Sequence, residues 1–229
     1  MTETAVDKIG SSRAKTNLRE KAYESFTERL LARDIRPGQF VSQRELVALT
    51  GLTLGAIREL IPRLEAEGLI KTVPQRGMQV AHVDLNLIRE AFQLRLFLER
   101  EATAIFAAEV SSGVVAQLRE EHESVLAAAR AGPITAELVA RAQAVDWNLH
   151  WTVISSLKNS IIADVYRVNS IKIRLIRQDQ TLLSEAIVVP VMQEHLSIIS
   201  AIETREPTLA VAAMSAHITS AAGRALGLK

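Results

Sequence analysis

The chain has 229 residues, of which 48% are hydrophobic and 4% aromatic, and it contains no cysteine. This length suits one or two domains, the low aromatic share favours helices, and the lack of cysteine excludes disulfides and thiolate metal sites. The formal net charge of +1 is too small to indicate a nucleic acid by itself. The sequence lacks an apolar N-terminal segment and any run of eighteen apolar residues, so we expect a cytoplasmic protein without a membrane partner.

Polarity and periodicity divide the chain into three segments. Residues 1–16 are polar and aperiodic, and we expect them to form a mobile arm. Residues 17–83 combine short helical patterns with a pair of strands, whereas residues 84–229 show almost only helical periodicity. We therefore predict a mainly α protein, with a small mixed domain followed by an all-α domain of six helices.

Helix caps and stops organise the small domain. Ser42 and Glu45 have the spacing of a capping box, so a helix is expected to begin directly after Ser42 and to end at Gly51. Thr53 can cap the next helix, which Gly68 ends. Two helices separated by so short a turn are typical of a helix-turn-helix.

A strand pair is expected directly after these two helices. Ile70–Val73 and Met78–Val83 are joined by a turn, Pro74–Gly77, which carries an exposed Arg76. Two helices followed by such a hairpin form a winged helix-turn-helix, in which the second helix and the wing meet DNA.

Arginines on the outward faces of this domain are the candidates for contact with DNA. The planar guanidinium group can bind a guanine edge or a phosphate. Each arginine taken singly also fits a solvated basic face. The capping box, the turn at Gly51, the helix end at Gly68 and the wing with Arg76 all agree with one motif, however, and this agreement favours DNA binding. The candidates are Arg44, Arg58, Arg63 and Arg76.

Residues 30–80 resemble the GntR family of bacterial transcription regulators. The matching segments are Arg36-Pro37-Gly38, Arg44-Glu45-Leu46, Arg58-Glu59, Leu64-Glu65-Ala66-Glu67-Gly68-Leu69 and Arg76-Gly77. The resemblance implies double-stranded DNA with a palindromic operator as partner, and a homodimer to bind it. The positions where relatives contact DNA are occupied here by Arg44, Thr53, Arg58 and Arg76.

Two departures from the family's pattern lie in the second helix. Leu54, Gly55 and Ala56 occupy positions that are often polar or, for the last, proline. Pro62 replaces a residue that is often arginine, and its missing N–H is expected to kink the helix near its end. The operator sequence therefore cannot be carried over from relatives.

Six amphipathic helices with short breaks are expected after residue 83. Their ranges are Asn86–Val110, Val114–Ala131, Thr135–Leu157, Ser160–Ile176, Val188–Glu203 and Thr208–Leu226.

Four ionisable residues fall on the apolar stripes of these helices. Asp146 and His150 are one turn apart on one helix, while His195 and His217 lie on the last two. A single buried histidine is more often a hydrogen-bonded core residue. One carboxylate and three imidazoles together, however, form a ligand set for Zn²⁺, Ni²⁺, Mn²⁺ or Fe²⁺, and we expect a divalent ion here, with zinc first.

The two other histidines have polar surroundings in the sequence. His82 ends a strand, and His122 has glutamates at three neighbouring positions. Both are expected to be exposed.

The order Asp146-x3-His150, His195 and His217 in an all-helical domain resembles the FCD effector domain, which follows a GntR winged helix in many regulators. The resemblance implies that the ion helps to hold an effector that bears a carboxylate. The six-helix count is similar to the VanR-like branch of the FadR subfamily.

Arg95 is a candidate for effector binding, because it lies on a buried stripe where a cation needs an anionic partner. Glu99, one turn later, offers an ordinary helix pair, and a carboxylate effector is the alternative partner. The spacing Arg95-x3-Glu99 also matches the FCD pattern. Asn169 is a second candidate for this pocket.

The sequence thus favours a DNA-binding repressor controlled by a metal ion and a small organic acid. Two alternatives remain at this point. One is a metal-dependent enzyme built on a helical bundle, for which no additional base motif is present. The other is a metal-sensing regulator without an organic effector.

Overall fold

The computed structural model describes residues 20–180 and 185–228. The chain divides into two compact units, Met1–Val83 and Asp84–Lys229. The arm expected at residues 1–16 lies outside the described residues. The described chain is mainly helical, which confirms the predicted fold class.

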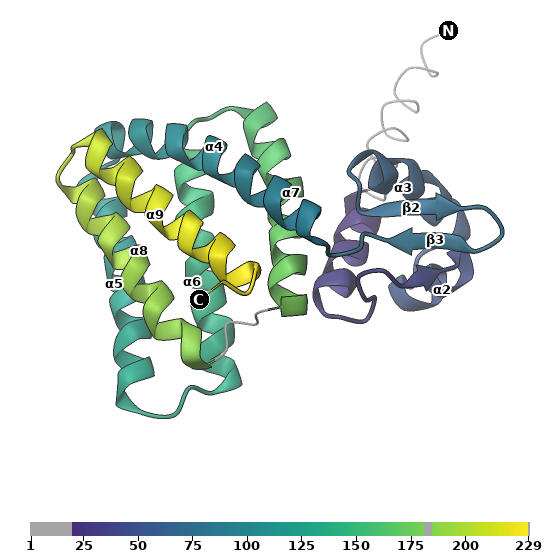
Figure 1. Ribbon diagram of the computed structural model, residues 1–229. Helices are drawn as coiled ribbons and strands as arrows, with labels where there is room; N and C mark the ends of the chain where they lie inside the picture. Colours follow the sequence, from purple (N-terminus) through teal and green to yellow (C-terminus); the bar gives the residue numbers. More distant parts are fainter. Residues whose placement is uncertain (1–19, 181–184, 229) are drawn as a thin grey trace, which may run out of the picture. The chain divides into compact units, whose positions relative to one another are not determined.

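The first unit is a winged helix-turn-helix (Figure 1). Its three strands form an antiparallel sheet in the order β1-β3-β2, so the predicted strand pair has a third member, the two-residue β1, that the sequence pattern did not indicate. The elements are a helix over residues 20–31, β1 Phe40–Val41, α2 Gln43–Thr50, α3 Leu54–Ala66, β2 Ile70–Val73 and β3 Gly77–Val80.

Local hydrogen bonds define both helices of the motif. The Ser42 N–H donates to Glu45 Oε2 at 2.6 Å and the Glu45 N–H donates to Ser42 Oγ at 3.2 Å, which completes the capping box of α2. Gly51 ends α2 with a left-handed φ of 70°. The Ala56 N–H donates to Thr53 Oγ1 at 3.3 Å and caps α3. The start and end of both helices therefore follow from these short polar and glycine residues.

Glycine is required at the first residue of β3. Gly77 has a φ of +90°, and a Cβ atom at this position would lie 2.8 Å from the carbonyl oxygen of Val41 in β1. Any other side chain would therefore strain the wing turn and push β1 away from β3.

The second unit consists of helices in the part of the chain that the structure describes, and it confirms the six expected ones. α7 continues four residues beyond the predicted end at Ile176, because the polar stretch that follows holds no glycine or proline to stop it. The helices are α4 Leu85–Glu109, α5 Ser112–Ala131, α6 Ala136–Ser155, α7 Ser160–Gln180, α8 Glu185–Glu203 and α9 Pro207–Ala225.

Packing in this unit brings the metal-ligand candidates together. α4 packs along α9 and also contacts α6 and α7, while α8 packs between α5 and α9 (Figure 1). A core of aliphatic side chains from α5, α6 and α8 includes Val125, Val145 and Met192. The inward faces of α4, α6, α8 and α9 therefore converge.

Among the helices that the structure describes, α8 alone is long and apolar enough to cross a membrane. The window Ala186–Glu203 of α8 has a mean hydropathy of 1.3, and 39% of it is buried. The same helix packs against α5, α6 and α9 and carries the buried His195, as the core helix of a bundle does.

Candidate functional site

The outward side of the helix-turn-helix carries two of the predicted DNA contacts. Arg58 on α3 and Arg44 on α2 are both exposed. Arg58 Nε donates to Gln43 Oε1 at 3.2 Å, so the start of α2 lies beside the first half of α3. Leu54 at the start of α3 is 39% exposed, which leaves an apolar side chain next to the cap residue Thr53.

Arg63 has partners inside its own unit. Arg63 NH1 donates to Glu20 Oε2 at 2.8 Å and Nε donates to Glu67 Oε1 at 3.2 Å. Its guanidinium carbon also lies 3.8 Å from the centroid of the Tyr23 ring. These contacts link α3 to the first helix, so a role for Arg63 at DNA stays a prediction with less support than that of Arg58.

The wing presents Arg76 at the surface, in the turn between β2 and β3. Its guanidinium carbon lies 4.3 Å from the centroid of the Phe40 ring on β1. This stacking positions the charge without neutralising it, which suits a contact with a phosphate.

Four side chains of the second unit form a buried cluster of potential metal ligands. The ligand atoms of Asp146, His150, His195 and His217 all lie within 4.8 Å of one another. His195 Nε2 is 3.3 Å from Asp146 Oδ1 and 3.3 Å from His217 Nε2. Ligands of a tetrahedral zinc ion lie roughly 3.3 Å apart, given bonds of about 2.0–2.1 Å.

Two of these histidines are held from behind by carboxylates. His150 Nδ1 donates to Glu99 Oε2 at 2.6 Å, and His217 Nδ1 donates to Glu194 Oε2 at 2.7 Å. Glu194 is itself bound by Arg224, whose NH1 donates to Oε1 at 2.7 Å. Hydrogen bonds of this kind orient metal-binding imidazoles and fix their tautomer, so that Nε2 carries the lone pair.

The third histidine is held by another imidazole. His122 Nε2 lies 3.1 Å from His195 Nδ1, and His122 Nδ1 lies 2.6 Å from the carbonyl oxygen of Leu118. His122 is fully buried, so the expectation of an exposed side chain was wrong. Its neighbours Leu118, Val125 and Leu126 place it on the buried stripe of α5, and this spacing outweighs the adjacent glutamates. His82 is exposed as predicted.

The cluster fits a divalent cation. His150 Nε2 is buried and has no hydrogen-bond partner among the described residues. Burial lowers the pKa of His195 well below its ordinary value, and His217 and His150 lower it further. Burial likewise lowers the pKa of His217 to about 4, against the hydrogen bond to Glu194. Neutral imidazoles whose lone pairs converge on a carboxylate repel one another unless a metal ion binds between them.

Arg95 lies next to this cluster. Its side chain is 2% exposed, and Nε donates to Glu99 Oε1 at 2.6 Å. Glu99 Oε1 also accepts from the Tyr166 hydroxyl at 2.8 Å, so Glu99 connects Arg95 to the ligand His150. Arg95 NH2 is buried and has no hydrogen-bond partner among the described residues. The predicted pair with Glu99 is therefore present, and it leaves one donor of the guanidinium group unused.

Asn169 is buried and binds the backbone. Its Nδ2 donates to the carbonyl oxygen of Ala91 on α4 at 2.9 Å, which fixes α7 against α4. Asn169 therefore has a structural contact between two helices, and a role in effector binding stays a prediction.

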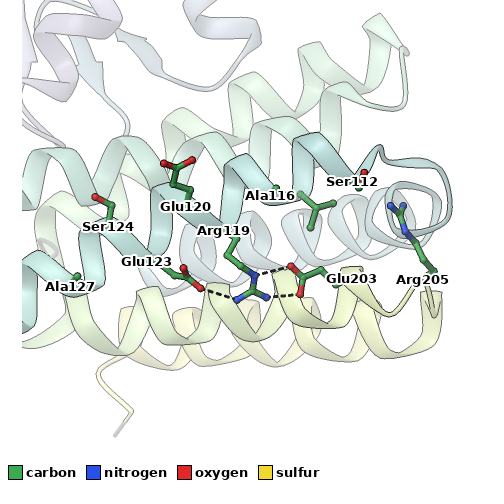
Figure 2. A pocket seen from close by; sticks show the side chains of 10 residues that line it. Ser112, Ala116, Arg119, Glu120, Glu123, Ser124, Ala127, Glu203 and Arg205 are labelled. Atoms are coloured by element: carbon green, nitrogen blue, oxygen red, sulfur yellow. Dashed lines mark hydrogen bonds and ion pairs between the residues drawn. The ribbon is translucent and has the colours of Figure 1, made fainter.

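A surface groove of 610 Å³ lies elsewhere on the second unit, along α5 (Figure 2). Its lining includes none of the metal-ligand candidates, nor Arg95 or Asn169. Arg119 in this groove donates to both oxygens of Glu203 at 2.7 Å and to Glu123 at 3.2 Å. The pair with Glu203 joins α5 to the end of α8, and all three guanidinium nitrogens of Arg119 have a carboxylate partner.

Two family descriptions match the chain. Residues 18–80 match the bacterial regulatory proteins of the gntR family, and residues 90–220 match the FCD domain. The chain belongs to the GntR family. It is a transcription regulator of this family with an FCD domain, and not an enzyme.

Relatives support this assignment. The chain is 26% identical over 187 residues to the Nta operon transcriptional regulator of Aminobacter aminovorans, a match that covers 80% of this chain and 82% of that protein. It is 30% identical over 112 residues to an HTH-type transcriptional regulator of Streptomyces ambofaciens, which covers 49% of this chain and 47% of the relative.

Solved structures share the fold. A GntR regulator from Rhodococcus sp. RHA1 superposes with a TM-score of 0.73 at 17% identity, covering 93% of this chain and 99% of its own. E. coli McbR/YncC gives a TM-score of 0.70 at 14% identity, with coverage of 89% and 94%.

Proposed function

We propose that this GntR regulator is a cytoplasmic, homodimeric repressor whose FCD domain binds one divalent ion, with zinc as the first candidate, and a small carboxylate effector. The domain division follows the two units, with DNA binding in residues 17–83 and effector binding in residues 84–229. The helical unit fits the VanR-like branch of the FadR subfamily. The observation that carries the proposal is the convergence of three imidazole Nε2 atoms on Asp146.

The choice of ion follows from the donor set. Three imidazoles and one carboxylate suit zinc, nickel, manganese or iron, and zinc is commonly bound by four such ligands. The ion would be held by Asp146, His150, His195 and His217. Because no thiolate is present, soft ions such as copper(I) are disfavoured.

The choice of effector follows from charge. The buried carboxylates of Asp146 and Glu99 face one buried guanidinium group, that of Arg95, which leaves one negative charge. A divalent ion changes this to one positive charge, and burying it without an anion is costly. A carboxylate effector would balance the charge and accept a hydrogen bond from the unused NH2 of Arg95.

The link to DNA is thermodynamic. An effector shifts operator binding only by its difference in affinity for the DNA-competent and DNA-incompetent arrangements. One short α3 helix reads few base pairs, so a homodimer on a palindrome is expected, with half-sites about 34–36 Å apart. Light scattering on the protein–operator complex tests this assembly, and one chain per operator would contradict it.

The test of the proposed function uses an operator selected from random duplex DNA and the protein in three states: as purified, stripped by a chelator, and reloaded with Zn²⁺. Elemental analysis should find one ion per chain in the loaded protein. His217→Ala should lose it, while His82→Ala, at an exposed histidine, should keep it. Full occupancy in His217→Ala would contradict the ligand set.

The effector is tested on the same three states with a panel of small mono- and dicarboxylates, with operator binding followed by fluorescence anisotropy. One class of acid should release the operator from the loaded protein only. If Zn²⁺ alone changes operator affinity and no acid adds to it, the protein is a metal sensor and the organic effector is refuted.

A further inference from the structure

His122 stands outside the four-ligand set but contacts it directly. It is fully buried on α5, and its Nε2 lies 3.1 Å from His195 Nδ1. Their ring centroids are 5.2 Å apart, with planes inclined by 64°. The two rings therefore meet edge to face, in a geometry that suits a nitrogen-to-nitrogen hydrogen bond.

The direction of this hydrogen bond follows from the backbone of α5. The carbonyl of Leu118 can only accept, so the proton of His122 must be on Nδ1, 2.6 Å away. A hydrogen bond between two ring nitrogens needs one donor and one acceptor, and with its proton on Nδ1 the neutral His122 ring offers Nε2 as the acceptor. His195 must then donate from Nδ1, which leaves its Nε2 with a lone pair.

We propose that His122 is a positioning residue of the metal centre. It donates from Nδ1 to the Leu118 carbonyl and accepts at Nε2 from His195 Nδ1, and this relay of two hydrogen bonds fixes the tautomer and ring orientation of His195. This inference rests on the proposed metal site. It gives all three ligands a partner behind the ring: Glu99 behind His150, Glu194 behind His217, and His122 behind His195. His195 is the ligand whose partner carries no charge.

Two variants of His122 separate this role from simple packing. An asparagine side chain reaches only as far as imidazole Nδ1, whereas a glutamine amide oxygen reaches the place of Nε2 and can accept from His195. His122→Asn should therefore lower metal affinity by about 10–100-fold, the usual effect of removing such a partner. His122→Gln should restore most of it. Leu126→Ala, a core truncation one turn further along α5, should destabilise the fold but leave metal affinity nearly unchanged.

Histidine tautomers provide a readout that does not depend on the ion. Long-range proton–nitrogen spectra of nitrogen-15-labelled protein distinguish protonated from bare ring nitrogens. In both the metal-free and the Zn²⁺-loaded wild type, His195 should carry its proton on Nδ1, and His122→Asn should lose this preference in the metal-free protein. If the wild type binds no Zn²⁺ but shows this tautomer, the metal site fails while the hydrogen-bond relay stands.

Any of three results would overturn the proposal. Wild-type Zn²⁺ affinity in His122→Asn would show that His122 does not support the ion. A His195 tautomer that is the same in wild type and His122→Asn would show that the relay does not set it. Equal losses of metal affinity in His122→Asn, His122→Gln and Leu126→Ala would assign the effect to packing alone.

Discussion

Arg95 and Glu99 form a buried salt bridge of 2.6 Å, one turn apart on α4. Glu99 uses its other oxygen for His150, so one carboxylate holds both a guanidinium group and a metal-ligand candidate. The pair that the sequence suggested as an ordinary helix contact is therefore part of the support of the site.

We expect Glu99→Gln to reduce the free energy of unfolding by about 3–5 kcal/mol, because a buried guanidinium group then lacks its counter-charge. Glu123→Gln is the matched control, since Glu123 is 56% exposed and pairs with Arg119 at the surface. This control should change stability by no more than about 1 kcal/mol. Urea unfolding of the metal-free proteins measures both, and equal effects would contradict the role given to Glu99.

The same carboxylate predicts a pH dependence. Burial would raise the pKa of Glu99, but the positive charge of Arg95 and the hydrogen bonds from His150 and Arg95 outweigh it and hold the pKa well below its ordinary value of 4.5. A group with a lowered folded-state pKa stabilises fully above its unfolded pKa, and this contribution is lost as the pH falls. The stability difference between wild type and Glu99→Gln should thus be constant well above pH 4.5 and shrink below it. A difference that grows with acid would refute this sign.

Some features of the fold were predictable because they depend on neighbours in sequence. The cap residues Ser42 and Thr53 act within three residues, and the stripe that holds Asp146 and His150 spans one turn. Periodicity therefore sufficed to place both helices of the motif and to bring the ligand pair to one face.

Other parts of the site depend on tertiary pairs that no local pattern specifies. Glu194 receives hydrogen bonds from His217 and Arg224, which lie 23 and 30 residues away on α9. The strand β1 is too short to show alternation, and it exists because β3 pairs with it. His122 differs, because its apolar neighbours on α5 did carry the signal of burial.

DNA binding should depend on Arg58 more than on Arg63. Arg58→Ala should cost about 1–3 kcal/mol of operator affinity if its side chain reads a base. Arg44→Ala should also weaken binding, by a similar amount on all sequences if it contacts phosphate. Arg63→Ala should have a smaller effect on affinity, since Glu20 and Glu67 already bind this side chain. Fluorescence anisotropy with operator and scrambled DNA measures the affinity of each variant. Unchanged operator affinity in Arg58→Ala would refute the proposed DNA-reading face of α3.

The wing should not tolerate a side chain at Gly77. Gly77→Ala should destabilise the first unit by about 1–3 kcal/mol, because its φ of +90° and the 2.8 Å approach to Val41 exclude a Cβ atom. Gly113→Ala is the control, since this glycine in the first turn of α5 has nothing within 4 Å of an added Cβ, and the change should not lower stability. Calorimetry should show a lower melting temperature for Gly77→Ala, and gel shift should show a lower operator affinity. Wild-type values in both measurements would contradict the proposed strain at Gly77.

The coupling of effector to metal is tested most directly at Arg95. Arg95→Lys keeps a positive charge beside Glu99 but loses the planar fork, and with it the NH2 donor that has no partner among the described residues. We expect normal Zn²⁺ content, because Arg95 is not a ligand candidate, and an effector affinity lowered by about tenfold or more, the loss expected for one hydrogen bond to a charged group. Arg100→Lys, at an exposed position of the same helix, should leave both unchanged.

Titration calorimetry of the Zn²⁺-loaded variants, with the acid that releases the operator, measures the effector affinity. Wild-type effector affinity in Arg95→Lys would show that Arg95 serves only the salt bridge to Glu99, and lost Zn²⁺ would show that it supports the ion through Glu99 and His150.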